Sequence, residues 1–160
     1  MTNFQARGIQ FYALATLVLI LDQLTKLWVR TNLPIGEGPS VIGDVIRLSH
    51  VQNYKGAFGL PAPTLVFIIA AFLAILVFIL YGVKLSQDNR QLGVSLALAF
   101  GGTVGNLADR ILFKSVTDFI DIGIPNIWRW PTFNIADTAL TIGAFLLAWN
   151  LFRSPPNKPE

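Results

Sequence analysis

Carboxylic side chains are the groups in this sequence with the clearest potential for chemistry. Asp137 lies within an apolar segment and has no basic residue within four positions on either side. A carboxyl at that depth either stays protonated or takes a partner from another segment. Asp118 precedes it by one short connection, so a hairpin can bring both carboxyls to one place. Two facing carboxyls share a proton and can act together as acid and base. The alternative is two loop carboxyls that never meet.

The acidic residues as a group are concentrated near the ends of apolar segments. The nine are Asp22, Glu37, Asp44, Asp88, Asp109, Asp118, Asp121, Asp137 and Glu160, and five of them fall on what we expect to be one membrane face. An ionisable side chain inside a spanning segment costs about 2.5 to 3.5 kcal/mol on insertion scales, so it tends to face a polar interior and to serve a function. A solvated position at the interface is the alternative for any one of them.

Two pairs of polar residues have helical spacing. Asp22 and Lys26 are four residues apart, which places them on one helix face as an ion pair that lowers the cost of insertion. A structural role is the favoured interpretation of that pair. Asn106 and Arg110 are also four apart and present an amide and a guanidinium to one region, to orient acids or to bind an anionic headgroup.

Small residues precede Asp109 in the same segment. Gly101 and Gly105 are four residues apart, a spacing that lets another helix approach closely. This pattern is common, so by itself it indicates only a helix contact.

Other catalytic chemistries lack the residues that would carry them. The chain has no cysteine, which excludes a thiol nucleophile, a disulfide scaffold and a cysteine metal site. His50 is the single histidine, and neither a His-Glu-x-x-His nor a Gly-x-Ser-x-Gly motif is present. A zinc hydrolase or a serine triad is therefore disfavoured, and we expect His50 to be a strand or loop residue without a catalytic role.

Four apolar segments are long enough to cross about 30 Å of hydrocarbon at 1.5 Å per residue. They cover residues 8–29, 64–83, 91–111 and 133–152. The first segment lacks a small-residue cleavage site after its apolar run, so we treat it as a retained helix rather than a signal peptide. The sequence thus predicts one polytopic membrane domain over residues 1–160.

The connections between these segments differ in character. Residues 31–63 are rich in Gly and Pro, and the pattern around Val41, Val45 and Val51 predicts short strands broken at Gly43. Residues 84–90 predict a short polar turn between antiparallel helices. The third connection contains Trp128, Trp130 and two prolines, a composition typical of an interfacial loop.

Composition agrees with a membrane protein. Of 160 residues, 53% are hydrophobic and 13% charged, and the mean hydropathy is +0.57. The net charge of +3 comes from scattered basic residues, which fits lipid headgroups and argues against nucleic acid as a partner. Lys and Arg are as frequent at one predicted membrane face as at the other, so the positive-inside rule does not fix the orientation.

Five sequence blocks, in order, resemble those of the lipoprotein signal peptidase (signal peptidase II) family. They are Asp22-Gln23-x-Thr25-Lys26, Asn53-x-x-Gly56-Ala57-Phe58, Gly101-Gly102-x-x-Gly105-Asn106-x-x-Asp109-Arg110, Val116-x-Asp118-Phe119 and Phe133-Asn134-x-Ala136-Asp137. Each block is weak alone, but five in order around four spans are highly specific.

The resemblance implies a bacterial inner-membrane aspartic endopeptidase that removes the signal peptide of prolipoproteins, cutting before a diacylglyceryl-modified cysteine. Asp118 and Asp137 match the catalytic pair of the family. Positions associated with substrate binding or with support of the site are matched by Asp22, Lys26, Asn53, Gly56, Ala57, Phe58, Asn106, Asp109, Arg110, Asn134 and Ala136. No cofactor or metal is implied, and cyclic peptides of the globomycin type are implied inhibitors.

The implied fold class is an all-α membrane protein, with four transmembrane helices and a small extracytoplasmic β-sheet element between the first two. The implied termini are cytoplasmic, and the implied active site faces the outer leaflet. The chain departs from the family pattern at Lys55, where the family commonly has a small residue.

Two other classes of function compete with the peptidase. A small proton-coupled transporter would use Asp22 and Asp137 as relays, and it predicts acids near the midplane and inverted repeats. The acids gather at one face instead, and the sequence shows no repeat. A noncatalytic assembly or lipid-binding subunit would tolerate replacement of Asp118 by Asn, whereas a peptidase would not.

Overall fold

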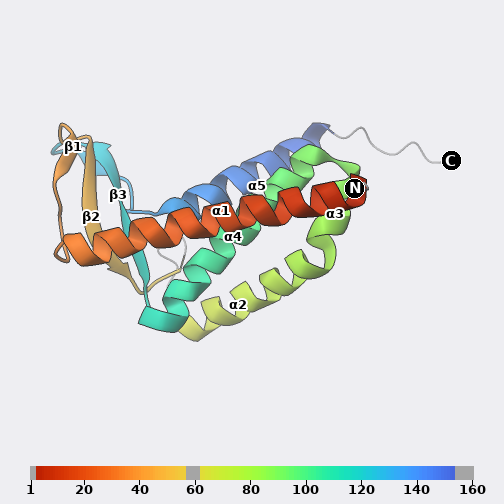
Figure 1. The fold of residues 1–160 in the computed structure, drawn as a ribbon. Helices are drawn as coiled ribbons and strands as arrows, with labels where there is room; N and C mark the ends of the chain where they lie inside the picture. The colour runs from red at the N-terminus through yellow and green to blue at the C-terminus, as the bar shows by residue number, and fades with distance from the viewer. Residues whose placement is uncertain (1–2, 57–61, 154–160) are drawn as a thin grey trace.

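The structure, a computed structural model, describes residues 3–56 and 62–153. It is a bundle of helices with a small sheet at one end (Figure 1). The helices are α1 (Asn3–Asn32), α2 (Thr64–Val77), the π-helical segment η2 (Phe78–Gly82), α3 (Val83–Asp88), α4 (Arg90–Phe113) and α5 (Ile135–Arg153). Among the described residues, four helical stretches are long and apolar enough to span a membrane, with α2, η2 and α3 forming one of them. This confirms the predicted four-span architecture.

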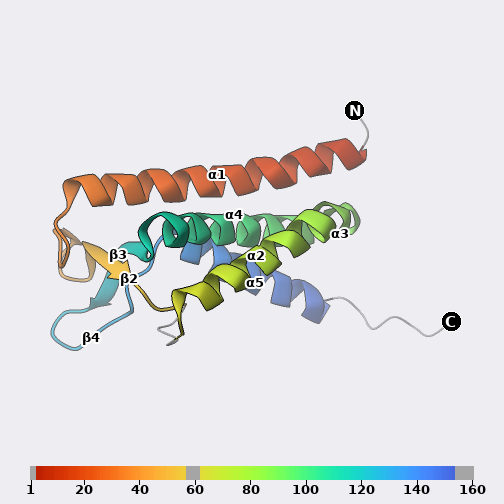
Figure 2. The same cartoon turned by 90° about the horizontal axis from the view of Figure 1, so that it is seen from below.

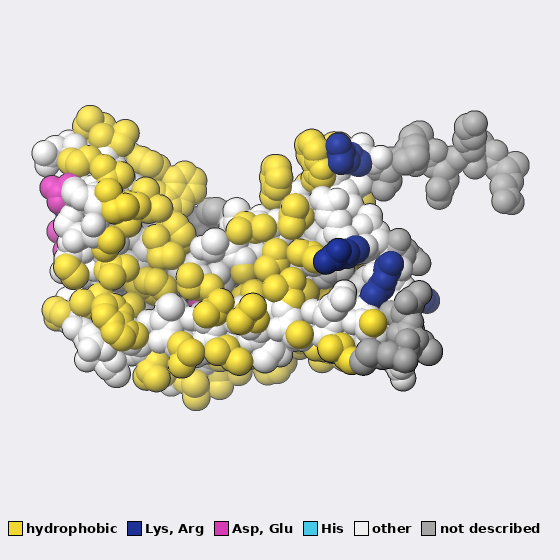
Figure 3. All heavy atoms as spheres, turned by 45° about the horizontal axis from the view of Figure 1, so that its top comes forward, with side chains coloured by type: hydrophobic (Ala, Val, Ile, Leu, Met, Phe, Trp, Pro, Cys, Tyr) yellow, Lys and Arg dark blue, Asp and Glu magenta, His cyan; other side chains and the backbone are white. Residues whose placement is uncertain are grey.

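Helix α4 is the centre of the bundle. It lies between α1 and the pair α2 and α5 (Figure 2), and half of its most apolar window is buried. Helix α2, in contrast, has no buried residue, and its large apolar side chains face outward. Apolar side chains cover the middle of the face in Figure 3, which is the surface expected of helices in lipid.

Glycines permit this central position of α4. A Cβ at Gly101 would lie 2.6 Å from the carbonyl oxygen of Ala15 on α1, and one at Gly102 would lie 2.5 Å from that of Ala136 on α5. Gly105 approaches Asp22 of α1 equally closely. The predicted small-residue contact is therefore confirmed for Gly101 and Gly105, and Gly102 adds a second face.

The sheet has four antiparallel strands in the order β1-β2-β3-β4. Strands β1 (Ser40–Ile42) and β2 (Ile46–Asn53) pair on either side of Gly43, where short strands broken at this glycine were predicted. Strands β3 (Val116–Ile124) and β4 (Trp128–Arg129) complete the sheet. A bridge between Ile120 and Phe133 then leads the chain from β3 into α5.

Two connections differ from the structure that was predicted for them. The sheet is not confined to residues 31–63, because β3 and β4 come from the connection that was expected to be an interfacial loop. Strand β3 is buried on both faces near its start, so its sequence lacks the alternation that identifies a half-exposed strand. The second and third spans are antiparallel, as predicted, but residues 84–90 are mostly helical, and Asn89 alone separates α3 from α4.

Candidate active site

Asp118 and Asp137 line the same cleft, one from β3 and the other from the first turn of α5. The cleft has a volume of about 960 Å³ and lies where α2, α4 and α5 meet the sheet. Its walls are largely apolar and include Phe67 of α2, Leu140 of α5 and Trp130 beside β4. The hairpin between α4 and α5 therefore does bring the two carboxyls to one place.

Two asparagines hold the carboxylate of Asp118, whose side chain is almost fully buried. Asn53, at the end of β2, donates to Oδ2 at 2.9 Å, and Asn134 donates to Oδ1 at 2.7 Å. Strand pairing places Asn53 here, because β2 and β3 pair as antiparallel neighbours with Val51 opposite Asp118. Each carboxylate oxygen thus has its own amide donor.

Asp137 is held by its helix and by α4. Its Oδ1 accepts a hydrogen bond of 2.8 Å from the amide of Asn106, and its backbone N–H donates to Oδ1 of Asn134 at 2.8 Å. That second bond makes Asn134 the N-cap of α5, since the cap residue accepts from a backbone N–H in the first turn. Asn134 therefore contacts both aspartates. Its side-chain NH₂ group donates to the carboxylate of Asp118, and its side-chain oxygen accepts from the backbone N–H of Asp137.

Burial and a nearby charge shift the pKa of Asp118. Burial first, and the nearby charge of Asp137 second, raise the pKa of Asp118 to about 7. The hydrogen bonds from Asn53 and Asn134 and the charge of Lys26 oppose that shift. Near neutral pH the Asp118 carboxyl can therefore be present in both its protonated and its ionised form.

Lys26 fixes the orientation of the Asn106 amide. The Lys26 ammonium donates to Oδ1 of Asn106 at 3.0 Å, and Asn134 donates to the same oxygen at 3.2 Å. Because Oδ1 faces two donors, the Nδ2 group must point the other way, toward Asp137. The buried lysine thus determines which end of the amide faces the cleft.

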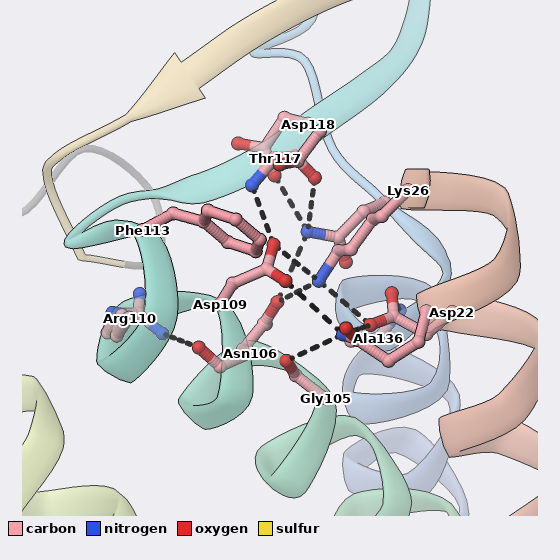
Figure 4. A network of polar contacts seen from close by, with 12 residues as sticks. Asp22, Lys26, Gly105, Asn106, Asp109, Arg110, Phe113, Thr117, Asp118 and Ala136 are labelled. Carbon is pink, nitrogen blue, oxygen red and sulfur yellow. Dashed lines mark hydrogen bonds and ion pairs between the residues drawn. The ribbon is translucent and has the colours of Figure 1, made fainter. Parts of the chain in front are cut away.

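A fully buried ion cluster lies behind the cleft (Figure 4). Lys26 lies 2.8 Å from Asp22 and 3.3 Å from Asp109, and none of the three side chains is exposed. The predicted pair of Asp22 and Lys26 is confirmed, and Asp109 makes it a triad. A buried charge needs such partners, because desolvation without compensation costs several kcal/mol per ion.

The two acids of this cluster hold the backbone beside the two cleft aspartates. Asp22 accepts from the N–H of Ala136 at 2.9 Å, one residue before Asp137. Asp109 accepts from the N–H of Thr117 at 2.9 Å, one residue before Asp118. Neither Asp22 nor Asp109 lines the cleft. Their geometry is that of supports for the segments that carry the cleft aspartates.

Arg110 lines the cleft near α2, and Gly56 packs against Phe67, another lining residue. Arg110 lines the cleft, donates to the backbone oxygen of Asn106 at 3.3 Å, and lies 5.4 Å from the ring centre of Phe67. Gly56 is buried against the same ring, where a Cβ would lie 2.2 Å from its carbons. Ala57 and Phe58, which the sequence analysis also singled out, lie outside the described residues.

His50 and Lys55, which the sequence analysis also discussed, do not line the cleft. His50 lies on β2 with Nδ1 2.9 Å from the carbonyl oxygen of Leu33, and it does not line the cleft. Lys55 is exposed, and its backbone N–H donates to the side chain of Asn53. Within residues 3–56 and 62–153, no group of three His, Asp or Glu side chains is arranged to hold a metal ion.

Sequence reasoning missed two supports of the site. Arg30 donates to Asp109 at 3.3 Å and to the hydroxyl of Thr117 at 3.0 Å. Its spacing of four residues from Lys26 was a usable signal, because it places both cations on one face of α1. Thr117 acts through its backbone N–H, for which a sequence contains no signal.

Comparisons with known proteins agree with this architecture. A family model described as signal peptidase (SPase) II matches residues 14–153. Lipoprotein signal peptidases of Moorella thermoacetica and Staphylococcus aureus are 43% and 36% identical, over 88% and 92% of this chain and 91% and 90% of theirs.

Solved structures agree as well. A bacterial membrane enzyme structure obtained by the in meso method at 2.3 Å resolution superposes with a TM-score of 0.84 at 34% identity, covering 94% of this chain and 92% of the other. A second, at 1.9 Å, gives a TM-score of 0.81 at 32% identity, covering 91% and 94%. With a family model that matches residues 14–153, and relatives that are 43% and 36% identical over most of both chains, the chain belongs to the signal peptidase II family.

Proposed function

We propose that this protein is an aspartic endopeptidase that removes signal peptides from prolipoproteins by cutting before a diacylglyceryl-modified cysteine. Asp118 and Asp137 are the proposed catalytic residues. The observation that carries the proposal is their convergence, from different elements, on one largely apolar cleft. The family supplies the substrate class, and the cleft supplies a place for the chemistry.

The proposed reaction uses the aspartate pair as acid and base. The ionised carboxylate takes a proton from a water molecule, and the oxygen of that water attacks the scissile carbonyl carbon. The protonated partner donates to the carbonyl oxygen, giving a neutral tetrahedral diol. When the C–N bond breaks, the protonated carboxyl gives its proton to the leaving nitrogen, while the ionised carboxylate takes a proton from one diol hydroxyl, whose oxygen becomes the carbonyl oxygen of the new carboxyl group. The pair then again holds one proton.

The surroundings of the pair favour one ionised carboxylate, which acts as the base, and one protonated carboxyl, which acts as the acid. Asn53, Asn106 and Asn134 are neutral donors, so they orient the carboxyl groups without supplying a cation that would hold both of them ionised. The ammonium of Lys26 is paired with Asp22 and Asp109, and its charge only partly opposes the rise in the pKa of Asp118. One proton can therefore remain in the pair near neutral pH, consistent with the raised pKa of Asp118.

The shape of the cleft suits a lipidated peptide. Apolar side chains of α2 and α5 line its length, while the aspartates and Arg110 lie near the sheet. Acyl chains can stay beside the helices while the peptide next to the modified cysteine reaches the carboxyls. The proposed setting is the bacterial inner membrane, with cytoplasmic termini and the cleft toward the outer leaflet. A globomycin-type cyclic peptide would occupy the same cleft.

The decisive experiment is cleavage of a diacylglyceryl-modified prolipoprotein by purified protein in detergent. We expect wild type to release a product whose new N-terminus is the lipidated cysteine, as identified by mass spectrometry. Asp118→Asn and Asp137→Asn should each lower kcat by at least about 100-fold, because each removes one member of the acid and base pair.

Asp44→Asn is the matched control, because Asp44 lies on the exposed β1–β2 turn, away from the cleft. It should cut like wild type, and all variants should elute as folded protein of the same size. Near-normal cleavage by either Asp118→Asn or Asp137→Asn would show that the pair is wrongly assigned. An inert wild type would remove the peptidase proposal and favour the transporter or the noncatalytic subunit.

A further inference from the structure

A second cavity lies at the opposite end of the bundle from the sheet, where α1 begins and α5 ends. It has a volume of about 290 Å³ and is enclosed by α1, α3 and α4. That volume is at the lower end of the range for ligand cavities, about 300 to 1,000 Å³. The cavity shares no residue with the cleft of Asp118 and Asp137.

Helices α1 and α4 line this cavity with matching faces. The lining residues of α1 are Arg7, Gln10, Phe11 and Leu14, and those of α4 are Arg90, Gly93, Val94 and Ala97. Both sets follow the spacing i, i+3, i+4, i+7 of one helix face. Both helices begin at this end of the bundle and run toward the sheet (Figures 1 and 2). Residues at equivalent positions of the two faces therefore line the cavity at the same depth.

Polarity changes along the cavity in the same direction on both helices. Each face begins with an arginine at the end of the bundle and becomes apolar about 10 Å deeper, at 1.5 Å per residue. The inner part is formed by Phe11 and Ala97, which are 2% and 0% exposed. A ligand that fits this gradient carries an anion at one end and a hydrocarbon chain at the other.

The arginine of α1 is held in place by the neighbouring helix. The Arg7 guanidinium donates to the backbone oxygen of Ser86 at 3.0 Å and also to that of Gln87, at the end of α3. Among the side chains that the structure describes, neither Arg7 nor Arg90 is in an ion pair. The guanidiniums at the mouth of the cavity thus keep donors for an anion.

The charge of this end of the chain points to the same ligand. Its described sequence segments contain Arg7, Lys84, Arg90 and Arg153 against one acid, Asp88. On the face drawn in Figure 3, Lys and Arg gather at this end, whereas Asp and Glu appear at the sheet end. Basic groups near a membrane surface attract anionic lipids, by about 1 kcal/mol per Lys or Arg.

We propose that this cavity binds an anionic phospholipid, with its phosphate between Arg7 and Arg90 and the start of one acyl chain against Phe11, Leu14 and Val94. The lipid would contact α1, α3 and α4 at once and so hold this end of the bundle together. This site is separate from the proposed catalytic cleft, and its test does not depend on cleavage.

The test is lipid binding by the full-length protein in detergent, followed by native mass spectrometry. The probes are phosphatidylglycerol, phosphatidylcholine and glycerol phosphate, the last being a headgroup without chains. We expect one phosphatidylglycerol to be retained in preference to phosphatidylcholine, and glycerol phosphate to be retained poorly. Arg90→Gln should weaken phosphatidylglycerol binding about fivefold, as expected for the loss of one interfacial cation.

Two further variants make the result specific. Val94→Phe keeps both arginines but fills the cavity, so it should abolish the preference for phosphatidylglycerol. Arg153→Gln is the matched control, because Arg153 lies at the same end of the bundle over the ring of Trp149 and does not line the cavity. Its affinity for phosphatidylglycerol should equal that of wild type.

Several results would overturn the proposal. Equal retention of phosphatidylglycerol and phosphatidylcholine, or an equal effect of Arg90→Gln and Arg153→Gln, would indicate general surface attraction. Tight retention of glycerol phosphate alone would indicate a site for a soluble anion. Unchanged binding in a folded Val94→Phe variant would show that the cavity is not where the lipid binds. Arg7 is left unchanged in this set, because it also caps α3.

Discussion

Asp22 accepts a hydrogen bond of 2.9 Å from the backbone N–H of Ala136, which lies 114 positions later in the chain. The bond joins the first span to the start of the last, one residue before Asp137. Asp109 makes the equivalent bond to Thr117, one residue before Asp118. Lys26 lies between the two acids and neutralises part of their charge. The positions of the proposed catalytic carboxyls thus depend on a buried cluster that does not line the cleft.

Loss of the Lys26 ammonium should destabilise the folded protein. In Lys26→Met the apolar stem is kept, but Asp22 and Asp109 remain buried without the ammonium. Removal of one partner of a buried ion pair typically costs about 3 to 5 kcal/mol. We expect a loss of that size in the free energy of unfolding, measured by denaturant titration in mixed micelles. Arg47→Met removes pairs with the exposed Glu37 and Asp44 and should cost at most about 1 kcal/mol. Equal losses in the two variants would contradict the central role of Lys26.

Gly105 should not tolerate even a methyl group. A Cβ there would lie 2.6 Å from Oδ2 of Asp22, so Gly105→Ala must displace the carboxylate that holds Ala136. We expect a destabilisation of about 1 to 3 kcal/mol, as is typical of overpacking, with a fall in kcat.

Gly8→Ala is the matched control for that change, because its nearest contact is Val83 at an ordinary 3.4 Å. Alanine is also the better helix former, by about 1 kcal/mol. Thermal unfolding should show Gly8→Ala to be at least as stable as wild type. A Gly105→Ala protein with wild-type stability and kcat would mean that Asp22 is not a support of the site.

Asn53 should set the alkaline limit of activity. Its hydrogen bond favours the ionised form of Asp118 and opposes the effects of burial and of Asp137, which together still leave the pKa at about 7. Without it, the pair keeps its proton to a higher pH, so the alkaline limb of kcat/KM for Asn53→Ala should move upward. Gln52→Ala, in which the lost group is exposed, should leave the limb in place. A downward shift for Asn53→Ala would contradict the assignment.

Asp118 should make stability depend on pH. Its pKa is about 7 in the folded protein against 3.8 ordinarily, so folding favours the neutral acid. Its contribution is therefore fully present below pH 4 and is lost as the pH rises to about 7. Asp118→Asn removes the group that titrates and with it this loss.

The measurement is the unfolding temperature of wild type and Asp118→Asn at pH 4.5 and pH 8. We expect the variant to gain on wild type at pH 8 by an amount that corresponds to a few kcal/mol, since one pKa unit equals about 1.4 kcal/mol. Parallel changes in the two proteins would show that Asp118 titrates normally.

Local properties of the sequence determined much of this protein. The apolar segments predicted four spans, although the helices extend beyond them, as α1 does from Asn3 to Asn32. The spacing of Asp22 and Lys26 predicted their ion pair, and that of Gly101 and Gly105 predicted a close helix contact. The two residues of each pair are four positions apart on one helix, so both pairs can be recognised without knowledge of the rest of the chain.

Only the tertiary structure decided how the site is assembled. Strand β3 gave no alternation because both of its faces are covered, and its pairing with β2 brings Asn53 to Asp118. Backbone donors such as those of Ala136 and Thr117 are the same in every residue type except proline, so no residue identity marks them. The sequence named the two aspartates, but packing of α1, α4 and α5 decided which groups hold them, because these bonds join residues far apart in the chain.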